Sequence, residues 1–186
     1  MSNAQSPIIV FSVAGLCSGL CSGLSCGLPL TGLIIPGILF GTALSYATHT
    51  SLTPLSSGQR ATLIVASTGG YFTAITVMHL SMKLPGFDNS SLFSSCAAAV
   101  AGGFGALVVA GALLFVILDL SIVTTLFVVT FVGAVFGSAF MFCGMYMRDF
   151  TSIGRPFHDI VSFSLWQASV ASVVPFCRSR LAQTPT

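Results

Sequence analysis

The sequence predicts an all-α integral membrane protein with about six transmembrane helices. Of its 186 residues, 54% are hydrophobic and 5% are charged, whereas roughly a quarter of the residues in soluble domains are charged. Apolar runs long enough to cross about 30 Å of hydrocarbon recur along the chain. Glycines recur at a spacing of four, as in closely packed membrane helices. We therefore expect a single multi-pass domain over residues 1–186 that contacts the lipid bilayer.

Three apolar runs make up the first half of the chain. Residues 7–28 form the first span, and residues 29–48 form the second, since Pro29 is suited to the first turn of a helix. The polar stretch 49–59 then leads to a third span over residues 60–82. If the first two spans merge, or if one is re-entrant, the alternative is five helices.

The second half contains an apolar run that is too long for one helix. Residues 92–147 greatly exceed the roughly 20 residues that one crossing needs. Asp119 is the one acid inside this run, so we divide the run there into a fourth and a fifth span. Residues 148–159 form a charged loop, and a sixth span covers residues 160–177.

Small residues at a spacing of four predict close helix packing of the GxxxG type. Gly15, Gly19, Gly23 and Gly27 form a glycine zipper on one face of the first predicted helix, bare of side chains. Further glycines with the same packing role recur in later spans: Gly37, Gly41, Gly102, Gly133 and Gly137. These ridges specify helix contacts and identify no substrate.

A weak internal repeat divides the chain into residues 8–82 and 92–177. Sliding the sequence by 96 residues places Gly37 and Gly41 on Gly133 and Gly137. Three spans in each half would invert the second copy, giving the 3+3 inverted repeat common in small transporters. The alternative is coincidence, since a chain rich in Gly, Ala, Leu and Phe produces such matches often.

Five residues form a candidate solute path. Pro36 and Gly37 interrupt the second span, and a proline within a membrane helix leaves a backbone carbonyl without its usual donor. The candidates are Pro36, Gly37, Thr68, Tyr71 and Asp119. The alternatives are that Pro36 makes only a packed kink, and that Asp119 lies in a helix turn at the membrane surface.

Soft side chains and histidines suggest metal or haem sites that the spacing disfavours. The candidate ligands for a soft metal such as Cu(I) are Cys17, Cys21, Met141, Cys143 and Met145. None forms a CxxC pair, and both residue types are ordinary in apolar helices. His49 and His79 lie at opposite ends of consecutive predicted spans, on opposite sides of the membrane, which disfavours a shared haem. We expect no metal and no cofactor.

The charge and the lack of catalytic motifs leave two classes of function. A net charge of +2 without a basic run excludes a nucleic-acid partner, and the basic residues divide evenly between the two sides of a six-span model. The chain lacks Glu and any HExxH or GxSxG motif, so we expect no enzyme. The first hypothesis is a small transport or permeation unit for a small solute or ion. The second is a structural or accessory subunit, with a homo-oligomer or other membrane proteins as partners.

Overall fold

The computed structural model describes residues 6–25, 34–84, 91–148 and 154–178, without the side chains of Ser91, 142–148 and 154–156. This part of the chain contains six α-helices and one short 3-10 helix, and its single β-bridge joins Leu120 to Arg178. The helices are α1 (Pro7–Ser25), α2 (Ile35–Ser51), α3 (Ser57–Ser81), α4 (Ser91–Val116), α5 (Ile122–Arg148) and α6 (Gly154–Val173), followed by η2 (Val174–Cys177). The all-α prediction is confirmed.

Five of the six helices are long and apolar enough to cross a membrane. They are α1, α3, α4, α5 and α6, the last continuing through η2. The described part of α2 has 17 residues and is shorter than the other five. The chain is therefore a multi-pass integral membrane protein.

The division of the long apolar run at Asp119 is confirmed. Helix α4 ends at Val116 and α5 begins at Ile122, so Asp119 lies in the connecting turn. The predicted start of the sixth span was too late, because α6 begins at Gly154. Pro156 stands in the first turn of α6, where a missing N–H costs nothing.

The interpretation of Pro36 as a break within a span is wrong. Helix α2 begins at Ile35, and Pro36 occupies its first turn. The first N–H groups of a helix have no partner within it, so proline removes no hydrogen bond there. The predicted start of this helix at Pro29, and Gly27 of the first glycine ridge, lie outside the described residues.

Helix α3 begins three residues before its predicted start because of a capping box. The Ser56 hydroxyl accepts a hydrogen bond from the Gln59 backbone N–H at 3.2 Å, and the Gln59 side chain accepts one from the Ser56 N–H at 2.9 Å. The pattern Ser-x-x-Gln is a known helix start. It was present in the sequence of the loop before Arg60.

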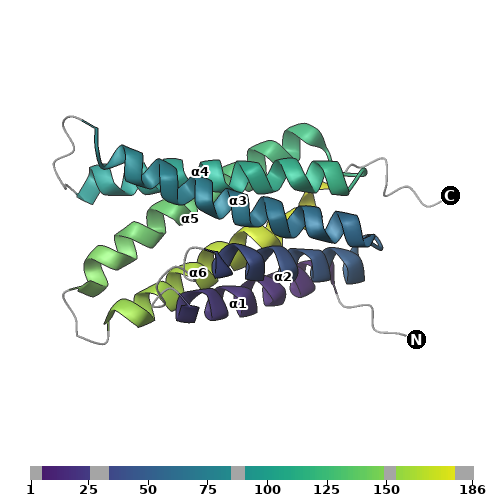
Figure 1. Cartoon of the computed structure of the whole chain (residues 1–186), viewed down its shortest axis with the longest axis horizontal. Coiled ribbons are helices and arrows are strands. Elements are labelled where there is room, and N and C mark those ends of the chain that lie inside the picture. Colours follow the sequence, from purple (N-terminus) through teal and green to yellow (C-terminus); the bar gives the residue numbers. More distant parts are fainter. Residues whose placement is uncertain (1–5, 26–33, 85–90, 149–153, 179–186) are drawn as a thin grey trace.

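Each helix packs against the next helix in the sequence, from α1 to α6. Helix α1 also packs against α6, which closes the bundle (Figure 1). We call the end where α3 and α5 begin and α4 and α6 finish the closed end. We call the opposite end, where α3 and α5 finish and α4 and α6 begin, the cavity end. In Figure 1 the cavity end lies at the left, where α5 diverges from α4.

The first glycine ridge packs against the backbone of α6. A Cβ added at Gly15, Gly19 or Gly23 would meet backbone atoms of α6 at 2.6, 2.4 and 2.3 Å respectively. These contacts run from Gln167 back to Ile160, so the two helices are antiparallel. Successive glycines of α1, four residues apart, contact sites on α6 that are also about four residues apart. The two backbones approach so closely because no side chain separates them.

The other small-residue pairs also face helices of the same chain. Gly37 and Gly41 of α2 lie against the α3 backbone, where an added Cβ would come within 2.5 Å of a Cα atom in each case. Gly133 and Gly137 of α5 lie against α4, where their closest contacts include the backbone of Gly102. The glycines of α1, α2, α4 and α5 named here are thus covered within the chain.

Candidate binding cavity

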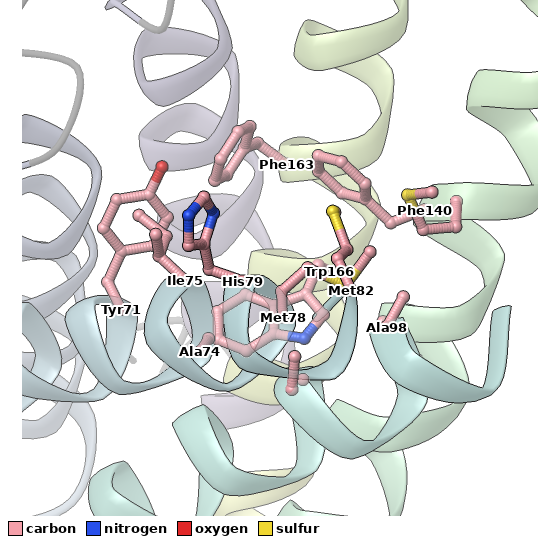
Figure 2. A pocket seen from close by; sticks show the side chains of 14 residues that line it. Tyr71, Ala74, Ile75, Met78, His79, Met82, Ala98, Phe140, Phe163 and Trp166 are labelled. Carbon is pink, nitrogen blue, oxygen red and sulfur yellow. The ribbon is translucent and has the colours of Figure 1, made fainter. Parts of the chain in front are cut away.

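A cavity of about 320 Å³ lies between α3, α4, α5 and α6 in the half of the bundle at the cavity end (Figure 2). Its wall is almost entirely carbon and sulfur. The lining residues are Tyr71, Ala74, Ile75, Met78, His79 and Met82 of α3, Ala98, Ala101 and Gly102 of α4, Gly137, Phe140 and Met141 of α5, and Phe163 and Trp166 of α6.

Sequence spacing explains why these residues face one space. The α3 residues in the wall recur at intervals of three and four, which places them on one side of a helix. The facing parts of α4 and α5 carry small residues, including Ala98, Gly102 and Gly137, where the two backbones are in close contact. The helices therefore leave a space that the side chains of α3 and α6 only partly fill.

Aromatic rings form the side of the cavity next to α6. The Phe163 ring lies 5.8 Å from that of Tyr71 and 5.4 Å from that of Phe140, measured between centroids. The Trp166 indole N–H donates to the Gly133 carbonyl at 3.1 Å, and its ring lies 5.5 Å from Phe40. The indole is thus fixed by a hydrogen bond and a ring contact.

His79 is the one histidine in the described wall. It lies in the last turn of α3, two residues before the helix ends, and its side chain is exposed. In Figure 2 its imidazole is seen between Tyr71 and Phe163. No Asp or Glu is among the described residues that line the cavity. The wall is therefore apolar with a nitrogen donor near its outer edge.

His158 is held at the same end of the bundle by other contacts. Its Nε2 lies 2.9 Å from the Phe140 carbonyl oxygen, and its Nδ1 lies 3.2 Å from the Asp159 carboxylate. Its ring also packs edge-on against that of Phe140, with centroids 5.2 Å apart. His158 supports the wall through Phe140 and is not among the lining residues.

The closed end is solid and cross-linked by polar contacts. Arg178 pairs with Asp119 at 2.6 Å, and the Ser121 N–H donates to the Cys177 carbonyl at 2.8 Å. The Gln59 amide also reaches the Val116 carbonyl at 3.3 Å, so the start of α3 is joined to the end of α4. The buried core here includes Phe11, Leu44, Leu63, Val109, Leu113, Ile117, Val129, Val170 and Val174.

The structure does not bring the five candidates for the solute path together. Gly37 packs on the backbone of Thr68, whose hydroxyl donates to the Ile64 carbonyl of its own helix at 2.8 Å. Tyr71 lies in the cavity wall. Asp119 lies at the closed end in its ion pair, and Pro36 begins α2. Of the five, only Tyr71 lines the cavity.

The candidate soft-metal ligands are also separated. Cys17 and Cys21 are exposed on α1, on the side away from its glycine contact with α6. Met141 lies in the cavity wall. The side chains of Cys143 and Met145 lie outside the described residues. Within the described part of the chain, no three His, Cys, Asp or Glu side chains form a group that could hold a metal ion.

A buried polar cluster between α1 and α6 was not predicted. The Gln167 side chain is 2% exposed. Its oxygen lies 2.5 Å from the Ser18 hydroxyl, and its nitrogen donates to the Ser22 hydroxyl at 3.0 Å. The signal in the sequence was an amide within an apolar span, since such a group needs a polar partner in the membrane.

Comparisons of the chain with protein-family models, with curated proteins and with solved structures found no match.

Proposed function

We propose that this protein is a small transport unit whose cavity binds a small apolar or amphipathic solute. The observation that carries the proposal is the contrast between the two halves of the bundle. A cavity of about 320 Å³ occupies one half, and a buried core fills the other. Small-molecule sites commonly measure about 300–1,000 Å³. A cavity confined to one half of the bundle, with a filled core in the other half, is compatible with one state of an alternating-access cycle.

The chemistry of the wall favours an apolar solute over an ion. An ion crossing the bilayer needs oxygen or nitrogen ligands to replace its water. Among the described lining residues, only Tyr71, His79 and Trp166 have polar side-chain atoms, and the Trp166 N–H already donates to the Gly133 carbonyl. The remaining lining residues are apolar, including three methionines, which adapt to ligands of varied shape.

The coverage of the glycine ridges weakens the alternative of an accessory subunit. That hypothesis is supported by the several small-residue ridges, the few charges and the lack of a clear polar site in the sequence. Gly19 and Gly23, however, contact α6, and Gly133 and Gly137 contact α4. Among the described lining residues there is no carboxylate and no Ser, Thr or Cys.

The test compares a cavity-blocking variant with a matched control on the same helix. Ala98 is 7% exposed and lines the cavity, whereas Val100 is 49% exposed on α4 and is not a lining residue. We expect Ala98→Phe to abolish retention of small apolar solutes by the protein in nanodiscs, measured by native mass spectrometry, and to stop their uptake into proteoliposomes.

The control Val100→Phe should leave both measurements unchanged. If Ala98→Phe retains and transports the same solutes as the unchanged protein while remaining folded, the proposed role of the cavity is wrong. If the unchanged protein neither retains nor transports any of them, the transport proposal itself fails.

A further inference from the structure

We infer that the cavity selects a single-chain amphiphile whose head group offers an oxygen acceptor, and that His79 recognises that head group. This inference rests on the proposed function, because it specifies the solute of the same cavity. It combines three features of the described wall: its length and the small volume beside it, its apolar interior, and the position of its one histidine.

The dimensions of the cavity suit one alkyl chain. Its α3 wall runs from Tyr71 to Met82, a difference of 11 residues or about 16 Å along a helix axis. The cavity is therefore long enough for an elongated solute lying along α3. Its volume of about 320 Å³ is at the lower end of the range for small-molecule sites, about 300–1,000 Å³, which suits one alkyl chain better than the paired chains of a phospholipid.

The depth of the lining residues orients the ligand. His79 lies two residues from the end of α3 and is exposed, so we infer that the mouth of the cavity lies beside it. Trp166 lies 12 residues from the start of α6, about 18 Å along its axis. Tyr71 is similarly deep, about 12 Å from His79 along α3. A hydrocarbon tail therefore lies toward Trp166, and the head group lies at His79.

The mouth of the cavity favours an acceptor in the head group. A neutral imidazole has one N–H donor and a charged one has two, so His79 can donate in either state. Lys83 is exposed two residues beyond the end of α3, at the same end of the bundle, and is not itself a lining residue. Its ammonium group is a donor only. The Asp159 carboxylate of α6 lies beside His158 and is not among the lining residues.

Two kinds of head group share this chemistry: a carboxylate and a neutral carbonyl. The carboxylate would gain from the ammonium of Lys83 and from a protonated His79, whereas the carbonyl would gain only a hydrogen bond. A quaternary ammonium head group offers no acceptor and should bind least. The experiment therefore compares these three head groups on one chain length.

Trp166 supplies a site-specific signal, because it is the only tryptophan in the sequence and it lines the cavity. Bromine quenches tryptophan fluorescence on contact. Three straight-chain probes carry bromine on the terminal carbon and end in a carboxylate, a methyl ketone or a trimethylammonium group. Each is titrated into the full chain in nanodiscs of unbrominated lipid. We expect saturable quenching by the carboxylate or ketone at a concentration at least tenfold below that of the ammonium probe.

Two variants separate recognition of the head group from binding in the cavity. His79→Leu should raise the concentration of half-quenching at least tenfold for the preferred probe and remove the preference. His79→Gln, which retains an N–H donor, should recover part of it. Thr76→Leu is the control on α3, because Thr76 is exposed and does not line the cavity. Trp166 emission and elution volume check that each variant is folded.

The outcomes distinguish this inference from the proposed function. Equal quenching by all three probes, unchanged in His79→Leu and abolished in Ala98→Phe, would overturn recognition by His79 and leave the transport proposal standing. Stronger binding of the ammonium probe would also overturn it, since the aromatic wall would then be a cation site. Quenching that Ala98→Phe does not change would count against both. A probe with bromine beside its head group should quench Trp166 fluorescence less than a probe with bromine on the terminal carbon. The reverse result would contradict the orientation in which the tail lies toward Trp166.

Discussion

Substituting alanine for Gly19 tests the contact that joins the first and last helices. A Cβ at this position would lie 2.4 Å from the Ser164 Cα atom and 2.6 Å from the Phe163 carbonyl oxygen. Carbon atoms in van der Waals contact are about 3.5–4.0 Å apart. Both obstacles are backbone atoms, so no change of side-chain rotamer relieves the clash. Helix α6 must move away from α1 by more than about 1 Å.

The expected cost follows from this movement. Overpacking of an interior typically costs about 1–3 kcal/mol. The displacement also stretches the two hydrogen bonds between Gln167 and the serines of α1, at about 0.6 kcal/mol each in a membrane. We therefore expect Gly19→Ala to lower the free energy of unfolding by about 2–4 kcal/mol. Gly19→Leu and Gly23→Leu should prevent the contact altogether and disrupt folding or assembly.

The assay is unfolding in mixed micelles with increasing dodecyl sulfate, followed by the fluorescence of Trp166. Gly69 is the matched control, because nothing lies within 4 Å of a Cβ added there. Gly69→Ala should leave stability unchanged or raise it by up to about 1 kcal/mol through helix propensity. If Gly19→Ala is no less stable than Gly69→Ala, the close backbone contact does not stabilise the fold.

Substitutions at four further places test other features of the bundle. Cys17→Ala and Cys21→Ala should each change stability by less than about 0.5 kcal/mol in the same assay, because both side chains are exposed; a loss larger than that of the glycine variants would revive the soft-metal hypothesis. Gln167→Ala should lower the free energy of unfolding by about 1–2 kcal/mol, because two hydrogen bonds are lost. Unchanged stability would show that Ser18 and Ser22 find other hydrogen-bond partners. Asp119→Cys, in a background without native cysteines, should react with a membrane-impermeant thiol reagent in open membranes, since the Asp119 side chain is 31% exposed in a turn; complete protection would place it inside the bilayer. Ser56→Ala should lower stability by about 1 kcal/mol through loss of the α3 cap, and recovery by Ser56→Asp would confirm capping as the cause.

The helices themselves were predictable because they depend on local chemistry. A bilayer core offers no water to the backbone, so every long apolar run must satisfy its hydrogen bonds as a helix. The single acid in the run 92–147 therefore marked the turn between α4 and α5. The exact starts were less predictable, since Pro36 and Pro156 suit both a kink and a first turn.

The cavity could not be predicted, because it depends on how helices distant in the sequence converge. His79 and Trp166 are 87 positions apart, and neither belongs to a motif. The polar residues proposed for a solute path were chosen by type. In the structure the Thr68 hydroxyl donates to a carbonyl of its own helix. Asp119 forms an ion pair with Arg178 at the closed end, away from the cavity.

The sequence by itself determined that this is a multi-pass helical membrane protein, because hydrophobicity and run length are properties of each segment alone. Only the tertiary structure decided what the small residues contact. The ridge at Gly15, Gly19 and Gly23 meets the protein's own α6. Glycine permits close approach by any helix, and the partner is chosen by the matching step along α6 and by the Gln167 amide, which needs the hydroxyls of α1.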